Sequence, residues 1–249
     1  MPIVFALITA LCSQETTVEV RLREWYARYD GAVTANGPLD NGTRFDAESD
    51  LGLDSHDLVH QIQLSVDFPE VGRFSLGYWQ LRQEGNDVLQ ADAIFDGQTF
   101  PGGSAVEFHL RFDVTSFDYE YPLLQGPVEI GLLAGLRYIS GETELKGGGA
   151  DQHANLNRPL LLPGFRIGAE LLPWLRADGR LQGLAFTAHN VKARYLESEV
   201  EISARPWPFL SISLGYQEVL TYFKALEDSL NFDLDGSIGG FYVALAVRF

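Results

Sequence analysis

The chain has 249 residues, with 34 acidic and 18 basic side chains and a net charge of -16 at pH 7. This acidic balance argues against a nucleic-acid partner, because phosphates need a basic surface. The single cysteine excludes a disulfide framework and a thiolate metal cluster. No stretch approaches the roughly 18 apolar residues of a membrane-spanning helix, so a chain of this kind that crosses a membrane does so with strands.

The first residues are apolar from Pro2 to Cys12 and polar after that. This pattern is typical of the core of a secretory signal, although the usual positive charges before it are missing. We interpret residues 1–13 as a signal peptide and residues 14–249 as one domain, because no linker composition or internal repeat divides them. The alternative is that residues 2–12 are a first hydrophobic segment of the mature fold.

Apolar residues then alternate with a period of two through most of the chain, which indicates strands and not helices. We predict ten strands, which cover residues 17–31, 56–68, 72–81, 105–114, 127–138, 164–172, 176–187, 197–205, 209–216 and 239–249. The alternation changes phase at Trp25 in the first of them, and in a similar way at Tyr78 and Trp79 in the third. A β-bulge, which inserts one extra residue, is the simplest explanation.

The connections between these strands alternate in length, with one exception: the connection from Thr187 to Asn190 is short where a long one is expected. Those around residues 69–71, 122–127, 173–175 and 206–208 are short and rich in proline, whereas those around 32–55, 82–104, 139–159 and 224–237 are long and polar. Short turns at one end, long loops at the other and an even strand count are typical of a transmembrane β-barrel. Trp174 and Trp207 lie in short turns, where such barrels carry an aromatic girdle.

The two faces of the strands then decide between a membrane barrel and a soluble one. The face opposite the apolar one carries glycine and arginine mixed with carboxylates, and the whole chain has three lysines. A crowded lumen suits this composition, because arginine binds carboxylates bidentately in partly desolvated space. We therefore expect the apolar faces to meet lipid; in a lipocalin-like soluble barrel they would point inward.

This assignment predicts a set of charged residues that line the lumen. They are Arg21, Arg23, Glu107, His109, Arg111, Asp113, Glu129, Arg137, Arg166, Glu170, Asp178, Arg180, Glu197, Glu199, Glu201 and Arg248. One interpretation is a salt-bridged interior that fills a narrow barrel, since ten strands leave little more room than side chains need. The other is a narrow ion path. We do not expect a wide pore, because porins have about sixteen strands.

The ending FYVALAVRF resembles the C-terminal recognition strand of Gram-negative outer-membrane proteins. The alternate positions that carry the resemblance are Phe241, Val243, Leu245, Val247 and the terminal Phe249. The first part of the chain also resembles a group of small outer-membrane barrels. The resemblance lies in REWYARYDG, in a loop that contains DLGLD and, further on, in GRFSLGYWQL. The resemblance implies insertion by the outer-membrane assembly machinery, and it implies no activity.

Two groups of loop residues are candidates for chemistry. Carboxylates at Asp46, Glu48, Asp50 and Asp54, and at Asp233 and Asp235, offer the oxygen ligands that Ca²⁺ prefers, although the second group lacks the later acidic ligand of an EF-hand. Asp151 and His153, with Asp233 and Asp235, resemble the rim pairs of omptin-like proteases in spacing alone. Solvated acidic loops are the simpler interpretation of both.

The sequence therefore predicts an all-β, antiparallel up-and-down transmembrane barrel of about ten strands, with eight or twelve as alternative counts. We expect it in the outer membrane, with periplasmic termini, among lipids and lipopolysaccharide, and with no cofactor. The expected role is non-enzymatic, as a structural or surface-interaction protein or a narrow channel. A rim hydrolase and a soluble ligand-binding barrel are the alternatives.

Overall fold

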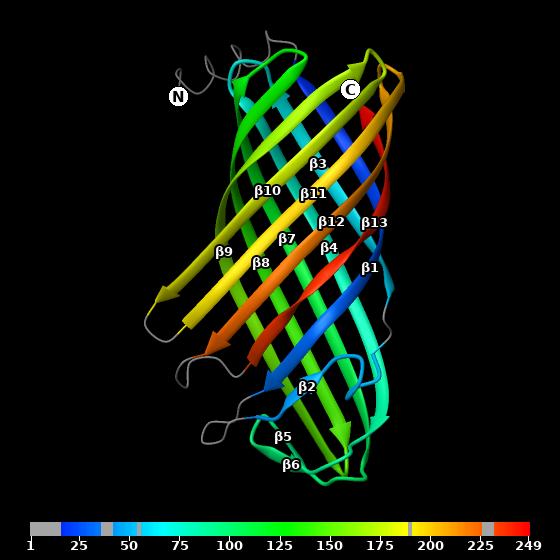
Figure 1. Cartoon of the computed structure of the whole chain (residues 1–249), viewed down its shortest axis with the longest axis vertical. Coiled ribbons are helices and arrows are strands. Elements are labelled where there is room, and N and C mark those ends of the chain that lie inside the picture. Colours follow the sequence, from blue (N-terminus) through cyan, green and yellow to red (C-terminus); the bar gives the residue numbers. More distant parts are fainter. Residues whose placement is uncertain (1–15, 36–41, 54–55, 189–190, 226–231) are drawn as a thin grey trace, which may run out of the picture.

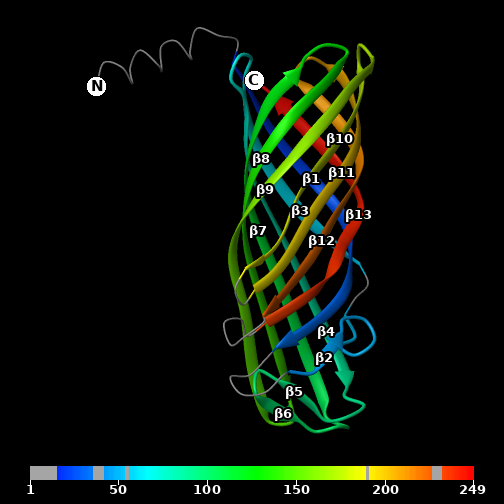
Figure 2. The same cartoon turned by 60° about the vertical axis from the view of Figure 1, so that its left-hand side comes forward.

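The computed structural model describes residues 16–35, 42–53, 56–188, 191–225 and 232–249. Ten long antiparallel strands close into a tall barrel, because β13 pairs with β1 (Figures 1 and 2). These strands are β1 (Thr17–Ala35), β3 (Asp57–Phe68), β4 (Gly72–Val88), β7 (Ala105–Leu124), β8 (Val128–Gly147), β9 (Ala150–Leu172), β10 (Leu175–Ala188), β11 (Val191–Trp207), β12 (Leu210–Ala225) and β13 (Phe232–Arg248). Among the described residues, no helix is long and apolar enough to cross a membrane.

The two ends of the barrel differ. At the end that we call the turn end, short turns join the strands and the C-terminus lies beside them, at the top of Figure 1. At the opposite end, the loop end, lie β2 (Arg44–Asp46), which pairs with β1, and the small hairpin of β5 (Ala93–Phe95) and β6 (Gln98–Phe100). The residues predicted as signal peptide, 1–13, and the loop residue Asp54 lie outside the described ranges.

The long loop predicted between residues 139 and 159 is wrong. β8 and β9 run through that segment and meet at a tight turn, where Gly148 and Gly149 have φ values of 58° and 85°. Glycine adopts this left-handed backbone without steric cost. Polar residues there suggested a loop, yet they belong to strands whose outer face is polar.

Several strands are much longer than a membrane requires. β7, β8 and β9 have 20, 20 and 23 residues, whereas about 9–11 residues of a tilted strand cross the hydrocarbon layer. The barrel therefore has two halves along its axis, and their chemistry is opposite. In the half at the turn end, the turn half, apolar side chains face outward and polar ones inward; in the half at the loop end, the loop half, the interior is apolar.

The change from one half to the other explains the shifts of phase in the sequence. Pairing of β1 with β3 and with β13 is continuous through Trp25, and β4 pairs continuously through Tyr78 and Trp79. The predicted bulges are therefore wrong. The same face of β1 points inward throughout, and it changes from charged at Arg23 to apolar at Trp25 because the surroundings change.

An apolar core fills the loop half. Trp79 contacts Trp25 edge-on, with ring centroids 5.6 Å apart, and Phe112 at 5.7 Å. The connections at the loop end close over this core, since Phe45 from β2 and Phe95 from β5 are buried in it. Other buried members include Leu51, Leu81, Phe100, Phe108, Ile139, Leu145, Leu156, Tyr195 and Phe223.

A belt of exposed apolar side chains surrounds the turn half. It includes Leu22, Ile62, Leu76, Phe117, Leu132, Leu136, Phe165, Ile167, Val200, Ile202, Ile212, Leu214, Phe241, Val243 and Leu245. Trp174 and Trp207 lie exposed at its turn end, where the predicted aromatic girdle places them. β13 follows the predicted alternation: Phe241 and Val243 face outward, whereas Tyr242 and Ala244 are buried in the barrel.

Candidate functional site: the charged lumen

The lumen of the turn half holds arginines and carboxylates in nearly equal numbers. They are Glu19, Arg21, Arg23, Asp67, Arg73, Asp118, Glu120, Glu129, Arg137, Arg166, Glu170, Arg176, Asp178, Arg180, Glu197, Glu199, Glu201, Arg205 and Arg248. Most of the chain's net charge of -16 therefore lies on residues outside this set. Twelve of the sixteen predicted lumen residues are in this set.

Arg137 is at the centre of the first cluster, next to the apolar core on its turn-end side. Its guanidinium donates to Asp118 Oδ1 at 2.8 Å, to Glu197 Oε2 at 2.8 Å and to Gln182 Oε1 at 2.9 Å. These partners come from β7, β11 and β10, so the cluster ties opposite walls of the barrel together. Arg180 adds a second cation, 2.7 Å from Asp118 Oδ2. A buried charge of this kind is stable because every charge has a hydrogen-bonded partner.

Arg23 forms the second cluster. It donates to Glu199 Oε1 and to Gln217 Oε1, each at 2.6 Å, and its guanidinium carbon lies 3.8 Å above the ring of Tyr242. The Tyr242 hydroxyl oxygen lies within hydrogen-bond distance of both carboxylates, 2.7 Å from Glu199 Oε1 and 2.9 Å from Glu201 Oε2. The cluster joins β1, β11, β12 and β13 across the seam that closes the barrel.

A third cluster lies towards the turn end. Arg166 donates to Glu120 at 2.7 Å and to Asp178 at 2.5 Å, and Arg176 donates to Asp178 at 2.8 Å and to Glu129 at 2.5 Å. Beside it opens a polar cavity of about 350 Å³, which Arg73, Arg205, Arg248 and Glu170 also line. The lumen is therefore open to water at the turn end and is filled progressively by ion pairs towards the apolar core.

Four predicted lumen residues lie on the outer wall instead. Glu107, His109, Arg111 and Asp113 face outward from β7, whereas Phe108 and its even-numbered neighbours are buried inside. The prediction failed because this segment belongs to the loop half, where the apolar face is the inner one. Arg111 pairs there with Asp113 at 2.7 Å in an exposed position.

Several lumen residues were not predicted. Asp118, Glu120, Arg176 and Gln182 take part in the clusters, and Glu19 accepts a hydrogen bond from Arg248 at 2.6 Å. The alternation of β7 could have identified Asp118 and Glu120, because they continue its inward, even-numbered face beyond Val114. Recognising it requires knowing that the interior changes from apolar to polar along one strand.

The residue pairs that resembled protease rim pairs do not converge. Asp151 and His153 lie on the outer face of β9, and Asp233 and Asp235 face outward from β13. Strands β10, β11 and β12 separate β9 from β13. Asp235 contacts Arg44 of β2, so the two pairs do not share a cleft.

The acidic loop after β2 uses its carboxylates locally. Asp46 Oδ1 accepts hydrogen bonds from the backbone N–H of Ser49 at 2.9 Å and of Glu48 at 3.2 Å, and Asp50 Oδ2 accepts one from the N–H of Asp46 at 2.8 Å. The bond from Ser49 is the main reason that the pKa of Asp46 lies below its ordinary value. These contacts are those of a turn, which agrees with the simpler interpretation of this loop as a solvated acidic loop.

Comparisons with known proteins identify the fold. No protein-family model matches the chain, and no curated protein matches it in sequence. Its structure is similar to that of the outer-membrane protease OmpT from Escherichia coli, with a TM-score of 0.62 and 9% identity over 94% of this chain and 97% of that one. The translocator domain of the autotransporter NalP from Neisseria meningitidis aligns with a TM-score of 0.45 and 10% identity, over 98% and 93% of the two chains.

Neisserial surface protein A aligns with a TM-score of 0.35 and 14% identity, over 94% of this chain and 97% of that one. At sequence identities this low, structural similarity shows a shared fold and nothing about a shared function. The chain thus has the fold of a Gram-negative outer-membrane β-barrel, a closed antiparallel barrel of ten strands with one extra short strand.

Proposed function

We propose that this chain is a non-enzymatic outer-membrane barrel that does not conduct ions and that serves as a structural or surface-interaction protein. The apolar core of the loop half is the observation that supports this role. Trp25, Trp79 and Phe112 fill the bore on the loop-end side of the charged lumen, and Phe95 covers them from the loop end. A narrow channel, the other role that the sequence left open, needs a continuous polar path that these side chains interrupt.

In this proposal the turn end faces the periplasm, and the loop half stands outside the membrane. The exposed apolar belt contacts the lipids, with lipopolysaccharide around the edge of the belt nearer the loop end. The outward residues of β13, together with Phe249 directly after it, are the segment that the assembly machinery recognises. We do not propose a rim hydrolase, because the pair Asp151 and His153 on β9 lies apart from the pair Asp233 and Asp235 on β13.

The closed bore leads to an electrical prediction. The purified barrel in a planar lipid bilayer is expected to give no reproducible current steps under voltage, because an ion would have to leave water and cross an apolar core. A porin inserted in the same bilayer is the positive control, and a heat-dependent shift in gel mobility shows that the barrel is folded. Regular unitary steps from folded protein would contradict the proposal.

The position of the belt leads to a second prediction. Leu214, 63% exposed, lies near the middle of the belt on β12, and replacing it with arginine should cost about 2–4 kcal/mol of folding free energy in lipid. The matched control is Asn155→Arg on the outer face of the loop half, where little change is expected because water already surrounds it. Urea unfolding in lipid vesicles measures both. Equal losses at the two positions would show that the membrane does not surround this belt.

A further inference from the structure

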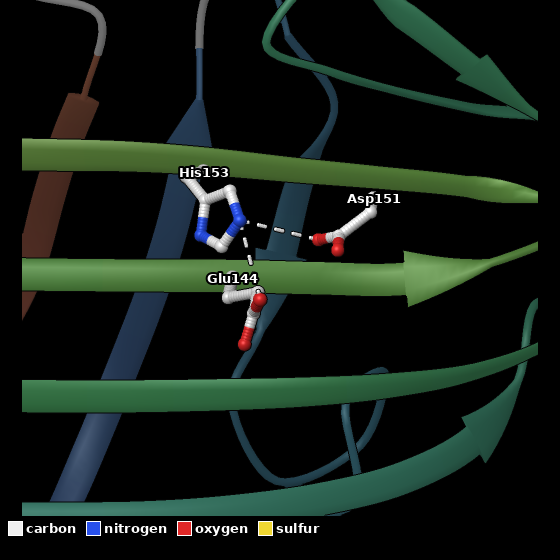
Figure 3. A group of neighbouring side chains, drawn as sticks. All are labelled: Glu144, Asp151 and His153. Atoms are coloured by element: carbon white, nitrogen blue, oxygen red, sulfur yellow. Dashed lines mark ion pairs between the residues drawn. The ribbon is translucent and has the colours of Figure 1, made fainter.

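A group of polar side chains on the outer wall of the loop half plays no part in the role proposed above. Glu144 on β8 and Asp151 and His153 on β9 lie together there, with both carboxylates turned towards the imidazole (Figure 3). Glu144 is the direct cross-strand partner of His153 on one side and of His109 on the other. The group therefore stands on paired strands that hold its spacing fixed.

The distances within the group fit a small coordination sphere. His153 Nε2 lies 3.2 Å from Glu144 Oε1 and 3.3 Å from Asp151 Oδ1. One ligand atom from each residue lies within 4.8 Å of the others. Zinc–ligand bonds of about 2.0–2.2 Å in a tetrahedron place ligand atoms about 3.3–3.6 Å apart. The imidazole and each carboxylate are thus already close to the spacing that one ion would impose.

The kinds of ligand select the class of metal. Imidazole nitrogen suits Zn²⁺ and its transition-metal neighbours, whereas Ca²⁺ takes six to eight oxygens at longer distances. One imidazole and two carboxylates are three protein ligands, which is the number that leaves the fourth tetrahedral position to water. We propose that Glu144, Asp151 and His153 form a divalent transition-metal site of the Zn²⁺ class on the outer wall of the barrel.

Lys146 competes with the ion at this site. Its ammonium lies 2.7 Å from Glu144 Oε1, the same oxygen that faces His153. The hydrogen bond from Lys146 is the main reason that the pKa of Glu144 lies below its ordinary value. Removing the ammonium leaves that oxygen free for the metal and removes a positive charge beside it. Loss of a ligand and loss of Lys146 should therefore change affinity in opposite directions.

The test is isothermal titration calorimetry. ZnCl₂ is titrated into the folded, tag-free barrel in detergent, after a chelator has removed bound metal from the protein. H153A is expected to weaken Zn²⁺ binding at least tenfold, because even the loss of a group that merely supports a metal ligand costs 10–100-fold. D151N should also weaken it, and Lys146→Met should strengthen it several-fold. Tetrahedral Co²⁺ bound at the same site should show its visible absorption in wild type and lose it in H153A.

His60→Ala is the matched control, because His60 is also an exposed outer-wall histidine, and it faces one carboxylate, Glu24 at 2.6 Å. Binding by this variant should equal that of wild type, and all variants should keep the heat-dependent gel shift of a folded barrel. Equal Zn²⁺ binding by wild type and H153A would overturn the proposal. Displacement of Zn²⁺ by an equal concentration of Ca²⁺ would overturn the assigned metal class.

Discussion

Replacing Arg137 with alanine is expected to lower the free energy of unfolding by about 3–5 kcal/mol, because it leaves buried carboxylates without their counter-ion. Arg137 is 2% exposed and contacts Asp118 and Glu197. Asp118 keeps Arg180 as a partner, so most of the cost comes from Glu197. Equilibrium urea unfolding of the barrel in lipid vesicles, followed by gel mobility, measures the loss.

Two further variants make this prediction specific. Glu197→Gln in the R137A background should recover part of the lost stability, because it removes the unpaired negative charge. Arg111→Ala removes an arginine that also lies 2.7 Å from a carboxylate, but on the exposed outer wall, so no measurable change is expected. If R137A and R111A had the same stability, the lumen would be wet enough to screen its ion pairs.

The second large effect is expected in the apolar core. Trp25→Ala should cost about 3–5 kcal/mol, since it removes a large buried side chain and leaves a cavity beside Trp79. The neighbouring Tyr26→Ala is the control, because Tyr26 faces outward and is 57% exposed, so a much smaller loss is expected. Unfolding in the same vesicles compares them. A loss from Y26A as large as that from W25A would mean that the loop half does not depend on its core.

The fold was predictable from the sequence because its main signals are local. Alternation with a period of two predicted the ten barrel strands, including the weak segment 176–187 that forms β10. Proline-rich short connections marked the turn end. These signals depend on the pleat of a strand and on turn chemistry, and neither changes with the surroundings of the barrel.

The assignment of faces was less predictable, because it depends on which medium surrounds each part of a strand. Phe108 and Phe117 are both phenylalanines of β7, yet Phe108 is fully buried and Phe117 faces outward. Their odd and even positions show that they lie on opposite faces. To decide which face is inside, one must know which part of the strand lies in the membrane. The composition of the strand does not give that position.

The individual contacts in the lumen were the least predictable. Arg137 contacts Glu197, which lies 60 positions further along the chain, and Arg23 contacts Glu199, 176 positions away. Such pairs are set by the order and stagger of strands around the barrel. A sequence pattern predicts that charges line the lumen, whereas the closed barrel decides which charges meet.

The reversal of chemistry between the two halves also fixes how the strands can slide past one another. At the boundary between the halves, Trp79 pairs with Val114, and Val114 pairs with Ile139. Two residues nearer the turn end, Gly77 pairs with Ser116, and Ser116 pairs with Arg137. A slip of one residue would turn charges to lipid in one half and apolar groups to water in the other. A slip of two would set a charge against the tryptophan layer. Both errors cost free energy, so the boundary between the two halves favours the correct register when the barrel assembles.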